Sequence, residues 1–317
     1  MLNQSFFSKR RVLMALGILT WLFLIWKGIP MVKSIFNTTH QSWLTIHPVA
    51  ILFALILMPI NWCLEAAKWY ILVKKDLTAG FQQAFNSVIS GLTLSLLTPN
   101  RLGEPFTRSM LLKSENYVIT TSAAVLCSLS QQLITIIAGI TGILYLLSHH
   151  QAFPSSQPSR QILAISTLTA ISVIIIILLI PAMVKKIVML PIMKRVKQSI
   201  SSLPLFGIYT TVKITGLSLT RYAVFTSQYL LLIYGVGANV SISIGLATIA
   251  TIFLIASTIP SLFFIDIGIR VSLAIIFLGP IIGDGWAAIV SSMIWLINIG
   301  IPASYGSVIL LLKPAKK

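Results

Sequence analysis

The chain has 317 residues, of which 56% are hydrophobic and 9% are charged, and its formal net charge is +17. With a mean hydropathy of +0.95 it has too little polar surface to cover a soluble globule, so the composition indicates an all-α, polytopic helical membrane protein. The lysines and arginines stand in short clusters between apolar stretches, which is typical of cytoplasmic loops and argues against nucleic-acid binding.

The first half of the chain contains five apolar stretches, at residues 12–29, 49–73, 81–98, 118–147 and 161–183. Basic residues precede the first stretch, with no cleavage site after it, and the strongest basic cluster follows the last. Five full crossings would put these two clusters on opposite sides of the membrane, against the positive-inside rule, whereas four keep both in the cytoplasm. We therefore expect residues 81–98 to enter and return, with the irregular segment 98–108 enclosed by protein.

The second half repeats this pattern loosely. Spans are expected at residues 213–236, 241–259 and 286–312, with an interrupted segment at 259–270 and a basic tail at the end. We predict about eight spans plus broken or re-entrant segments, arranged as a loose two-half pseudo-repeat. The whole chain, 1–317, is expected to form one transmembrane domain, with half 1 at 1–183, a cytoplasmic linker at 184–204 and half 2 at 205–317. Both termini should be cytoplasmic and the protein should lie in the inner, cytoplasmic membrane.

The two interrupted segments resemble each other. Each contains a proline, a glycine (Gly103 or Gly268) and an acid four residues before an arginine, as in Glu104 with Arg108 and Asp266 with Arg270. On a helix this spacing puts acid and base on one face, so the acid partly neutralises the arginine and leaves donors free for a ligand. Broken helices at corresponding positions of two halves are typical of a transporter binding site. The alternative is that both pairs are clamps that hold re-entrant loops.

Other polar residues inside apolar stretches have two interpretations each. Arg221 either snorkels to the cytoplasmic interface or faces a shared cavity. Gln131, Gln132 and Thr135 either join helices or line a cavity. Glu65 and Lys68 are interpreted as a self-satisfied ion pair at the interface, because Trp69 and Tyr70 follow them as an aromatic belt would.

Residues 97–112, with their proline, Gly103-Glu104 and Arg108, resemble the signature of the lysylphosphatidylglycerol synthase/flippase transmembrane family. Residues 259–270 are similar to the second signature of that family, and the resemblance covers nearly the whole chain in span order. The fourth-span pattern of the family usually carries a glutamate-arginine pair and a nearby aspartate, where this chain has Gln131, Gln132 and Thr135. The acid that often follows the second glycine is replaced, with Val271 at its place.

The resemblance implies movement of an anionic or aminoacylated lipid between leaflets. The bifunctional members carry a soluble domain that attaches the amino acid, and because the chain ends at Lys317 we expect no synthase activity. Guanidinium groups suit a lipid phosphate because they donate paired hydrogen bonds. The predicted substrate-binding residues are Arg101, Gly103, Glu104, Arg108, Arg221, Asp266, Gly268 and Arg270, with Gln131, Gln132 and Thr135 as candidate cavity lining.

Two other functions stay open. One is a membrane-embedded enzyme acting on a polyprenyl-phosphate lipid, although such chemistry usually needs several carboxylates and only Glu104 and Asp266 are expected at depth. The other is a non-transporting partner subunit of an envelope-lipid pathway. The expected partners are membrane lipids, with an envelope-biosynthesis enzyme or a second copy of the chain as further candidates. We expect no cofactor and no metal, since the two cysteines lack metal-ligand spacing.

Overall fold

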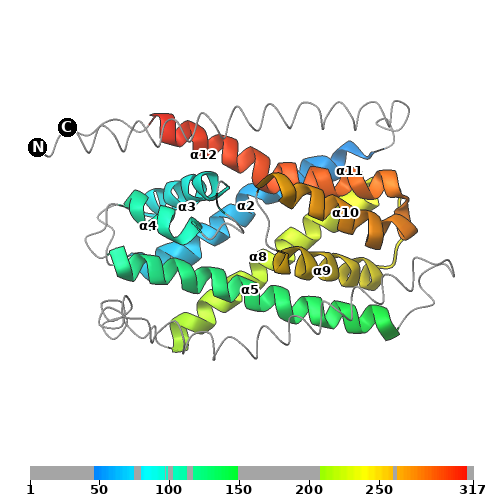
Figure 1. The fold of residues 1–317 in the computed structure, drawn as a ribbon, viewed down its shortest axis with the longest axis horizontal. Coiled ribbons are helices and arrows are strands. Elements are labelled where there is room, and N and C mark those ends of the chain that lie inside the picture. The colour runs from blue at the N-terminus through cyan, green and yellow to red at the C-terminus, as the bar shows by residue number, and fades with distance from the viewer. Residues whose placement is uncertain are drawn as a thin grey trace, which may run out of the picture.

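The computed structural model describes residues 46–74, 80–96, 98, 103–112, 117–148, 208–259 and 263–312. Every regular element within these ranges is a helix, which confirms the predicted all-α class (Figure 1). The predicted spans at 12–29 and 161–183, the linker at 184–204 and the basic tail lie outside the described residues, as does Arg101. The predicted domain boundaries and the number of about eight spans therefore stay predictions.

The described part of the first half contains one long helix on each side of a short hairpin. Its helices are α2 (Pro48–Val73), α3 (Phe81–Ser95), α4 (Glu104–Leu112) and α5 (Tyr117–Ser148). The helices α3 and α4, of 15 and 9 residues, are shorter than the roughly 20 residues that a span needs. They run antiparallel, since Thr107 lies against Gly91 and Gln83 donates to the carbonyl oxygen of Leu112. This hairpin has the form expected of the re-entrant element.

The second half contains α8 (Ile208–Gly235), α9 (Ile242–Thr258), α10 (Phe263–Ile282), α11 (Asp284–Trp295), the π-helical turn η4 (Leu296–Gly300) and α12 (Ile301–Leu312). Ser241 caps α9 by accepting a hydrogen bond from the backbone N–H of Ile244 at 3.4 Å. Gly283 joins α10 to α11 at φ 88°, a left-handed conformation that glycine adopts without a steric penalty. The helices α11, η4 and α12 follow one another without a break.

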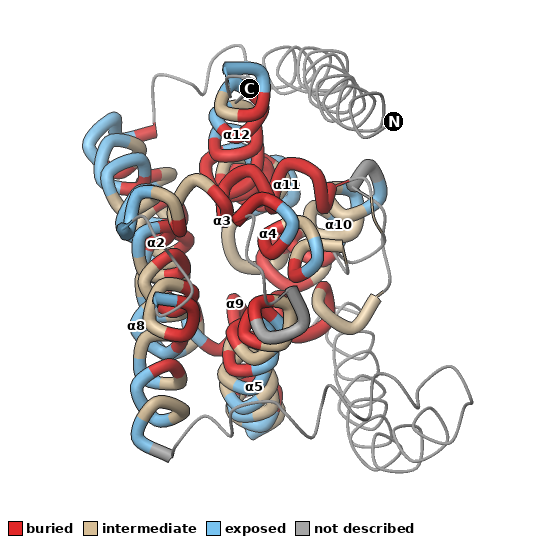
Figure 2. The backbone as a smooth tube through the Cα atoms, turned by 90° about the vertical axis from the view of Figure 1, so that its left-hand side faces the viewer, coloured by how far each residue is buried: buried red, intermediate tan, exposed pale blue. Residues whose placement is uncertain are grey.

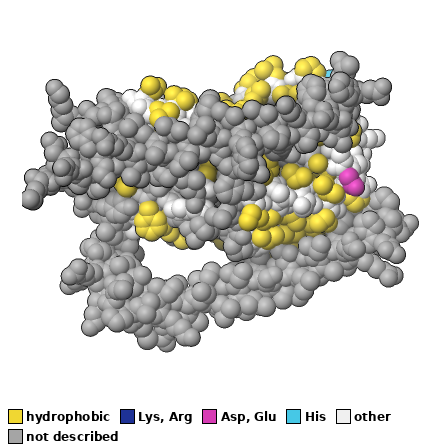
Figure 3. All heavy atoms as spheres, turned by 45° about the horizontal axis from the view of Figure 1, so that its top comes forward, with side chains coloured by type: hydrophobic (Ala, Val, Ile, Leu, Met, Phe, Trp, Pro, Cys, Tyr) yellow, Lys and Arg dark blue, Asp and Glu magenta, His cyan; other side chains and the backbone are white. Residues whose placement is uncertain are grey.

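Among the described residues, four helices are long and apolar enough to cross a membrane: Pro48–Val73, Thr120–Ser148, Ile265–Ile282 and Asp284–Leu312. The apolar helix α9, with 17 residues, is shorter. Large hydrophobic side chains such as Leu52, Leu129 and Leu144 are exposed on the outer faces of α2 and α5. On the face drawn in Figure 3, the described side chains that reach the surface are mostly hydrophobic. Such a surface suits a hydrocarbon environment, and the chain is a helical membrane protein.

Helices of the two halves pair reciprocally across the molecule. The pairs are α2 with α8, α5 with α9, and α12 with α3 (Figure 1). All three pairs are antiparallel. In the first, His47 donates to the carbonyl oxygen of Gly235 at one end while Lys68 meets Ser218 toward the other. Reciprocal antiparallel pairing of this kind is compatible with the predicted two-half pseudo-repeat, which stays a prediction.

Glycine allows the same close approach in two of these pairs. A Cβ atom on Gly142 of α5 would lie 2.6 Å from the carbonyl oxygen of Ala247 on α9. A Cβ atom on Gly306 of α12 would lie 2.6 Å from the carbonyl oxygen of Ile89 on α3. Small residues at such contacts let helix backbones pack closely in membranes, where apolar surface by itself drives little association.

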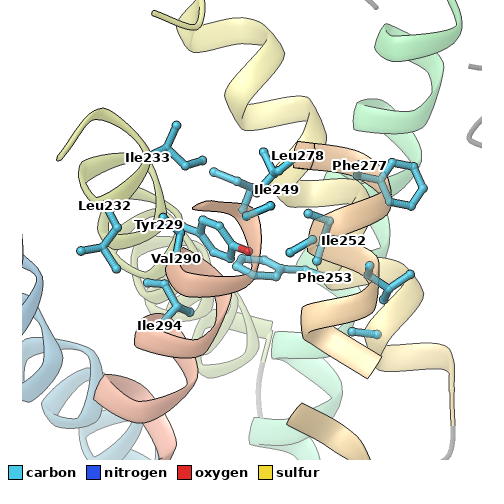
Figure 4. Close-up of a cluster of buried hydrophobic side chains, with 14 of the residues drawn as sticks. Tyr229, Leu232, Ile233, Ile249, Ile252, Phe253, Phe277, Leu278, Val290 and Ile294 are labelled. Carbon is cyan, nitrogen blue, oxygen red and sulfur yellow. The ribbon is translucent and has the colours of Figure 1, made fainter. Parts of the chain in front are cut away.

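Buried residues gather in two main hydrophobic clusters, one in each half. The first joins α2, α3 and α5 and also takes Ile214 of α8 and Ala303 of α12. The second joins α8 to α11 around Tyr229 and Phe253, whose ring centres lie 5.8 Å apart (Figure 4). Figure 2 shows that α9 and α11 are buried over much of their surface, whereas α2, α5 and α8 keep exposed faces. Each cluster includes side chains from the other half, so the two halves pack against each other through their cores.

Candidate functional site

The α3–α4 hairpin places Arg108 in the interior through contacts between residues that are close together in the sequence. Thr98 closes the break, since its Oγ1 accepts from the backbone N–H of Gly103 at 3.0 Å and donates to the carbonyl oxygen of Ser95 at 2.7 Å. Gly91 then leaves room for the arginine, because a Cβ atom there would lie 2.7 Å from Cγ of Arg108. Gly103, a predicted site residue, packs against the same hairpin, since a Cβ atom there would lie 2.8 Å from Cγ2 of Thr98.

Arg108 is the centre of a buried ion-pair cluster formed by four helices. Its Nη1 donates to Oε1 of Glu65 on α2 at 2.8 Å, and its Nη2 pairs with Glu104 one turn earlier on α4. The other oxygen of Glu65 lies 2.7 Å from Nζ of Lys68 and 3.2 Å from Nη1 of Arg221 on α8. One carboxylate of α2 thus receives three cations, two of which come from distant parts of the sequence.

Gln131 of α5 adds a neutral acceptor to this cluster. Its Oε1 accepts from Lys68 at 3.3 Å and from Arg221 at 3.4 Å, while its Nε2 donates to the carbonyl oxygen of Ser218 at 3.4 Å. The ring of Trp62 lies beneath Arg221, with the guanidinium carbon 5.3 Å from the ring centre. We call Glu65, Lys68, Glu104, Arg108 and Arg221, together with Gln131, the Arg108 cluster.

The Arg108 cluster carries one net positive charge when its groups are ionised, because three cations face two carboxylates. Lys68 is fully buried, and its Nζ has three acceptors, on Glu65, Gln131 and Ser218. Three acceptors match the three donors of an ammonium group, so this geometry suits the charged form of the lysine. The side chains of Arg221 and Glu104 are 20% and 15% exposed and form the accessible side of the cluster.

The second half holds a smaller charged site on α10. Arg270 donates from Nε to both carboxylate oxygens of Asp266, each at 3.0 Å, and the indole of Trp295 on α11 donates to Asp266 at 3.3 Å. One turn beyond Trp295, Asn298 accepts a hydrogen bond of 2.8 Å from Asn61. Because Asn61 lies one turn before Glu65, this hydrogen bond joins the helix that carries Glu65 to the π-helical turn that follows Trp295.

The structure brings four of the predicted site residues together, namely Glu104, Arg108, Arg221 and Gln131. Asp266 and Arg270 form their own pair, with the predicted i,i+4 geometry. Gln132 joins helices, since its Nε2 donates to Oγ of Ser257 on α9 at 2.9 Å, and Thr135 bonds back to the carbonyl oxygen of Gln131. Gly268 is exposed, and no atom of the described residues lies within 4 Å of the position of its missing Cβ.

The predicted ion pair between Glu65 and Lys68 forms, at 2.7 Å, but it is not self-satisfied. Both side chains are buried, and Glu65 binds Arg108 and Arg221 as well as its neighbour. Arg221 joins the same carboxylate, with its Nη1 3.2 Å from Glu65 and its side chain 20% exposed. The signal in the sequence that could have found this site is a carboxylate within a long apolar helix, since such a charge is kept only where partners compensate it.

Within the described residues, no group of three or more histidine, cysteine or acidic side chains is placed to hold a metal ion. The arrangement offers instead a concentration of guanidinium and ammonium donors in a site largely removed from water. Groups of this kind bind phosphate and other oxyanions through charge-assisted hydrogen bonds.

Comparison with known proteins agrees with the signatures in the sequence. The family model described as the lysylphosphatidylglycerol synthase TM region matches residues 11–301. Neither curated proteins nor solved structures give a match to the chain. Because the matched segment covers nearly the whole chain, including both interrupted segments and every helix of the Arg108 cluster, the protein belongs to the family of the lysylphosphatidylglycerol synthase transmembrane region.

Proposed function

We propose that this protein is a flippase-like lipid translocase, which moves an anionic or aminoacylated lipid between the two leaflets. Its family membership supports a function in membrane lipid metabolism. The observation that carries the proposal is the Arg108 cluster, a buried site with a net positive charge where helices of both halves meet. A phospholipid headgroup crosses hydrocarbon only if polar groups replace its water, and this site offers such groups.

The reciprocal pairing of helices supports a mechanism of alternating access. The antiparallel pairs α5–α9 and α3–α12 join each half to the other, and each half carries an acid-arginine pair, on α4 and on α10. A rocking motion of one half against the other would open the Arg108 cluster to one leaflet and then to the other. The acyl chains would stay in lipid, and no covalent bond would form or break, so we propose no enzymatic activity.

We also infer that the protein lies in the cytoplasmic membrane, with both termini on the cytoplasmic side. Antiparallel packing brings the end of α2 and the start of α8 to the same side of the molecule, and these ends carry Lys74 and Lys213. Lysines that gather on one side of the spans favour a cytoplasmic position for that side.

The test is lipid movement by the purified protein in liposomes that contain fluorescent lipids, with dithionite quenching of the outer leaflet. We expect the parent protein to move label above the rate of protein-free vesicles. Arg108→Ala and Arg221→Ala should lower the rate by about tenfold or more, because each removes a charged partner worth at least about 1.4 kcal/mol in the site. Lys213→Ala is the matched control, as it removes an exposed cation eight residues before Arg221 on the same helix and should keep the parent rate.

If the parent protein moves no label, the proposed function is wrong. If the parent is active and both arginine variants match it, lipid moves by a route that does not use the Arg108 cluster.

A further inference from the structure

The charges of the Arg108 cluster discriminate between the two kinds of lipid that the proposed function allows. Resting on that function, we infer that the cargo is a lipid whose headgroup carries a net negative charge, such as a simple phosphodiester, and that Gln131 sets this preference. An aminoacylated lipid with one or two ammonium groups is then a poor cargo.

The first step of the argument is the charge balance. Three cations and two carboxylates leave the cluster at +1, so a headgroup with one negative charge makes the occupied site neutral. A lysylated phosphatidylglycerol carries one phosphate and two ammonium groups and would raise the total to +2. Uncompensated charge in a site of low dielectric is costly, so the anionic headgroup is favoured.

The second step concerns the carboxylates that would have to receive an ammonium group. Glu65 binds Lys68, Arg108 and Arg221 and is buried. Glu104, which is partly exposed, pairs with Arg108. A cargo ammonium group would have to compete with these resident cations for both acids, and it would bring no new acceptor of its own.

The carboxylate of the second half is also occupied by resident donors. Both oxygens of Asp266 bind Arg270, and one also accepts a hydrogen bond from the indole of Trp295. In the Arg108 cluster the partly exposed cation is Arg221, whose side chain is one-fifth exposed. The site therefore presents a guanidinium group to an anion, whereas both of its carboxylates already pair with resident cations.

The third step identifies the residue that keeps the balance positive. Gln131 lies where Lys68 and Arg221 converge, and its neutral amide oxygen accepts from both. A glutamate has nearly the same shape and would place a full negative charge at this point. The cluster would then hold three cations and three carboxylates, with a net charge of zero, and its preference for an anion would weaken.

The experiment compares three labelled lipids in the same liposome assay: anionic phosphatidylglycerol, zwitterionic phosphatidylethanolamine and cationic lysyl-phosphatidylglycerol. We expect the parent protein to move the anionic lipid about tenfold faster than the cationic lipid, as one unit of charge at this partly exposed site is worth at least about 1.4 kcal/mol. Gln131→Glu should reduce this ratio to about threefold or less. Gln82→Glu is the control, because it makes the same substitution on an exposed face of α3 and should keep the parent ratio.

The outcomes separate this inference from the proposed function. Movement of the cationic lipid at a rate equal to or above that of the anionic lipid overturns the inference and leaves translocation intact. A ratio that stays at the parent value in a folded Gln131→Glu protein overturns the role of Gln131. If no lipid moves in any vesicle, the proposed function fails and this inference fails with it.

Discussion

Replacing Glu65 by glutamine should destabilise the protein more than any other single neutralisation of an acid in the described residues. The carboxylate of Glu65 lies 2.7 Å from Lys68, 2.8 Å from Arg108 and 3.2 Å from Arg221, and its side chain is only 4% exposed. Glu65→Gln keeps the shape but raises the net charge of the cluster from +1 to +2, with three cations and one carboxylate. Removal of one partner of a buried ion pair costs about 3–5 kcal/mol, and we expect a loss of that size in the free energy of unfolding.

The free energy of unfolding is measured by reversible SDS titration in mixed micelles, followed by tryptophan fluorescence. Asp284→Asn is the control, because it neutralises an exposed acid at the start of α11 and should cost less than about 1 kcal/mol. The double variant Glu65→Gln with Lys68→Met returns the cluster to +1 and should recover part of the loss. A cost below about 1 kcal/mol for Glu65→Gln, or a double variant no more stable than the single one, would refute the idea that Glu65 compensates three buried cations.

Two further predictions concern packing and polar contacts between helices. Gly142→Ala should destabilise the protein by about 1–3 kcal/mol, because its Cβ would lie 2.6 Å from the carbonyl oxygen of Ala247. The control, Gly216→Ala on the exposed surface of α8, should be neutral or stabilising by up to about 1 kcal/mol. Thermal unfolding of the two variants side by side checks the difference, and equal stability would contradict the close α5–α9 contact. A double-mutant cycle with alanine at Asn61 and Asn298 should give a coupling free energy of about 0.6–1.7 kcal/mol, as expected for a hydrogen bond between membrane helices. If the stability losses of the two single variants simply add in the double variant, this 2.8 Å bond adds nothing to stability.

The fold class could be predicted from the sequence because the bilayer constrains it strongly. A span must be long, apolar and helical, so composition and the length of apolar runs suffice to identify the class. The break at residues 98–103 was also predictable, because proline and glycine interrupt the apolar pattern there. The positive-inside rule, applied to the basic clusters on either side of the first half, also argued against a full crossing. The pairing of Glu104 with Arg108 and of Asp266 with Arg270 is local, because residues four apart on a helix are neighbours.

The partners of Glu65 could not be predicted in the same way. Local spacing suggested a pair with Lys68, and an aromatic belt suggested the interface. Whether a charged residue is at the surface or in the interior depends on which face of the helix is covered. In this protein α3, α5 and α8 pack on α2, and Arg108 reaches Glu65 from α4. The tight contact of Gly91 with Arg108 is equally invisible in the sequence, because it depends on how the hairpin closes.

By itself, the sequence determined that this is a helical membrane protein of the lysylphosphatidylglycerol synthase transmembrane family, with a broken helix and an acid-arginine pair in each half. Only the tertiary structure decided that the arginine of the first pair joins Glu65, Lys68 and Arg221 in one buried cluster with an excess positive charge. The physical reason is that hydropathy and i,i+4 spacing are properties of a single segment, whereas the compensation of a buried charge depends on residues that packing brings together from four helices.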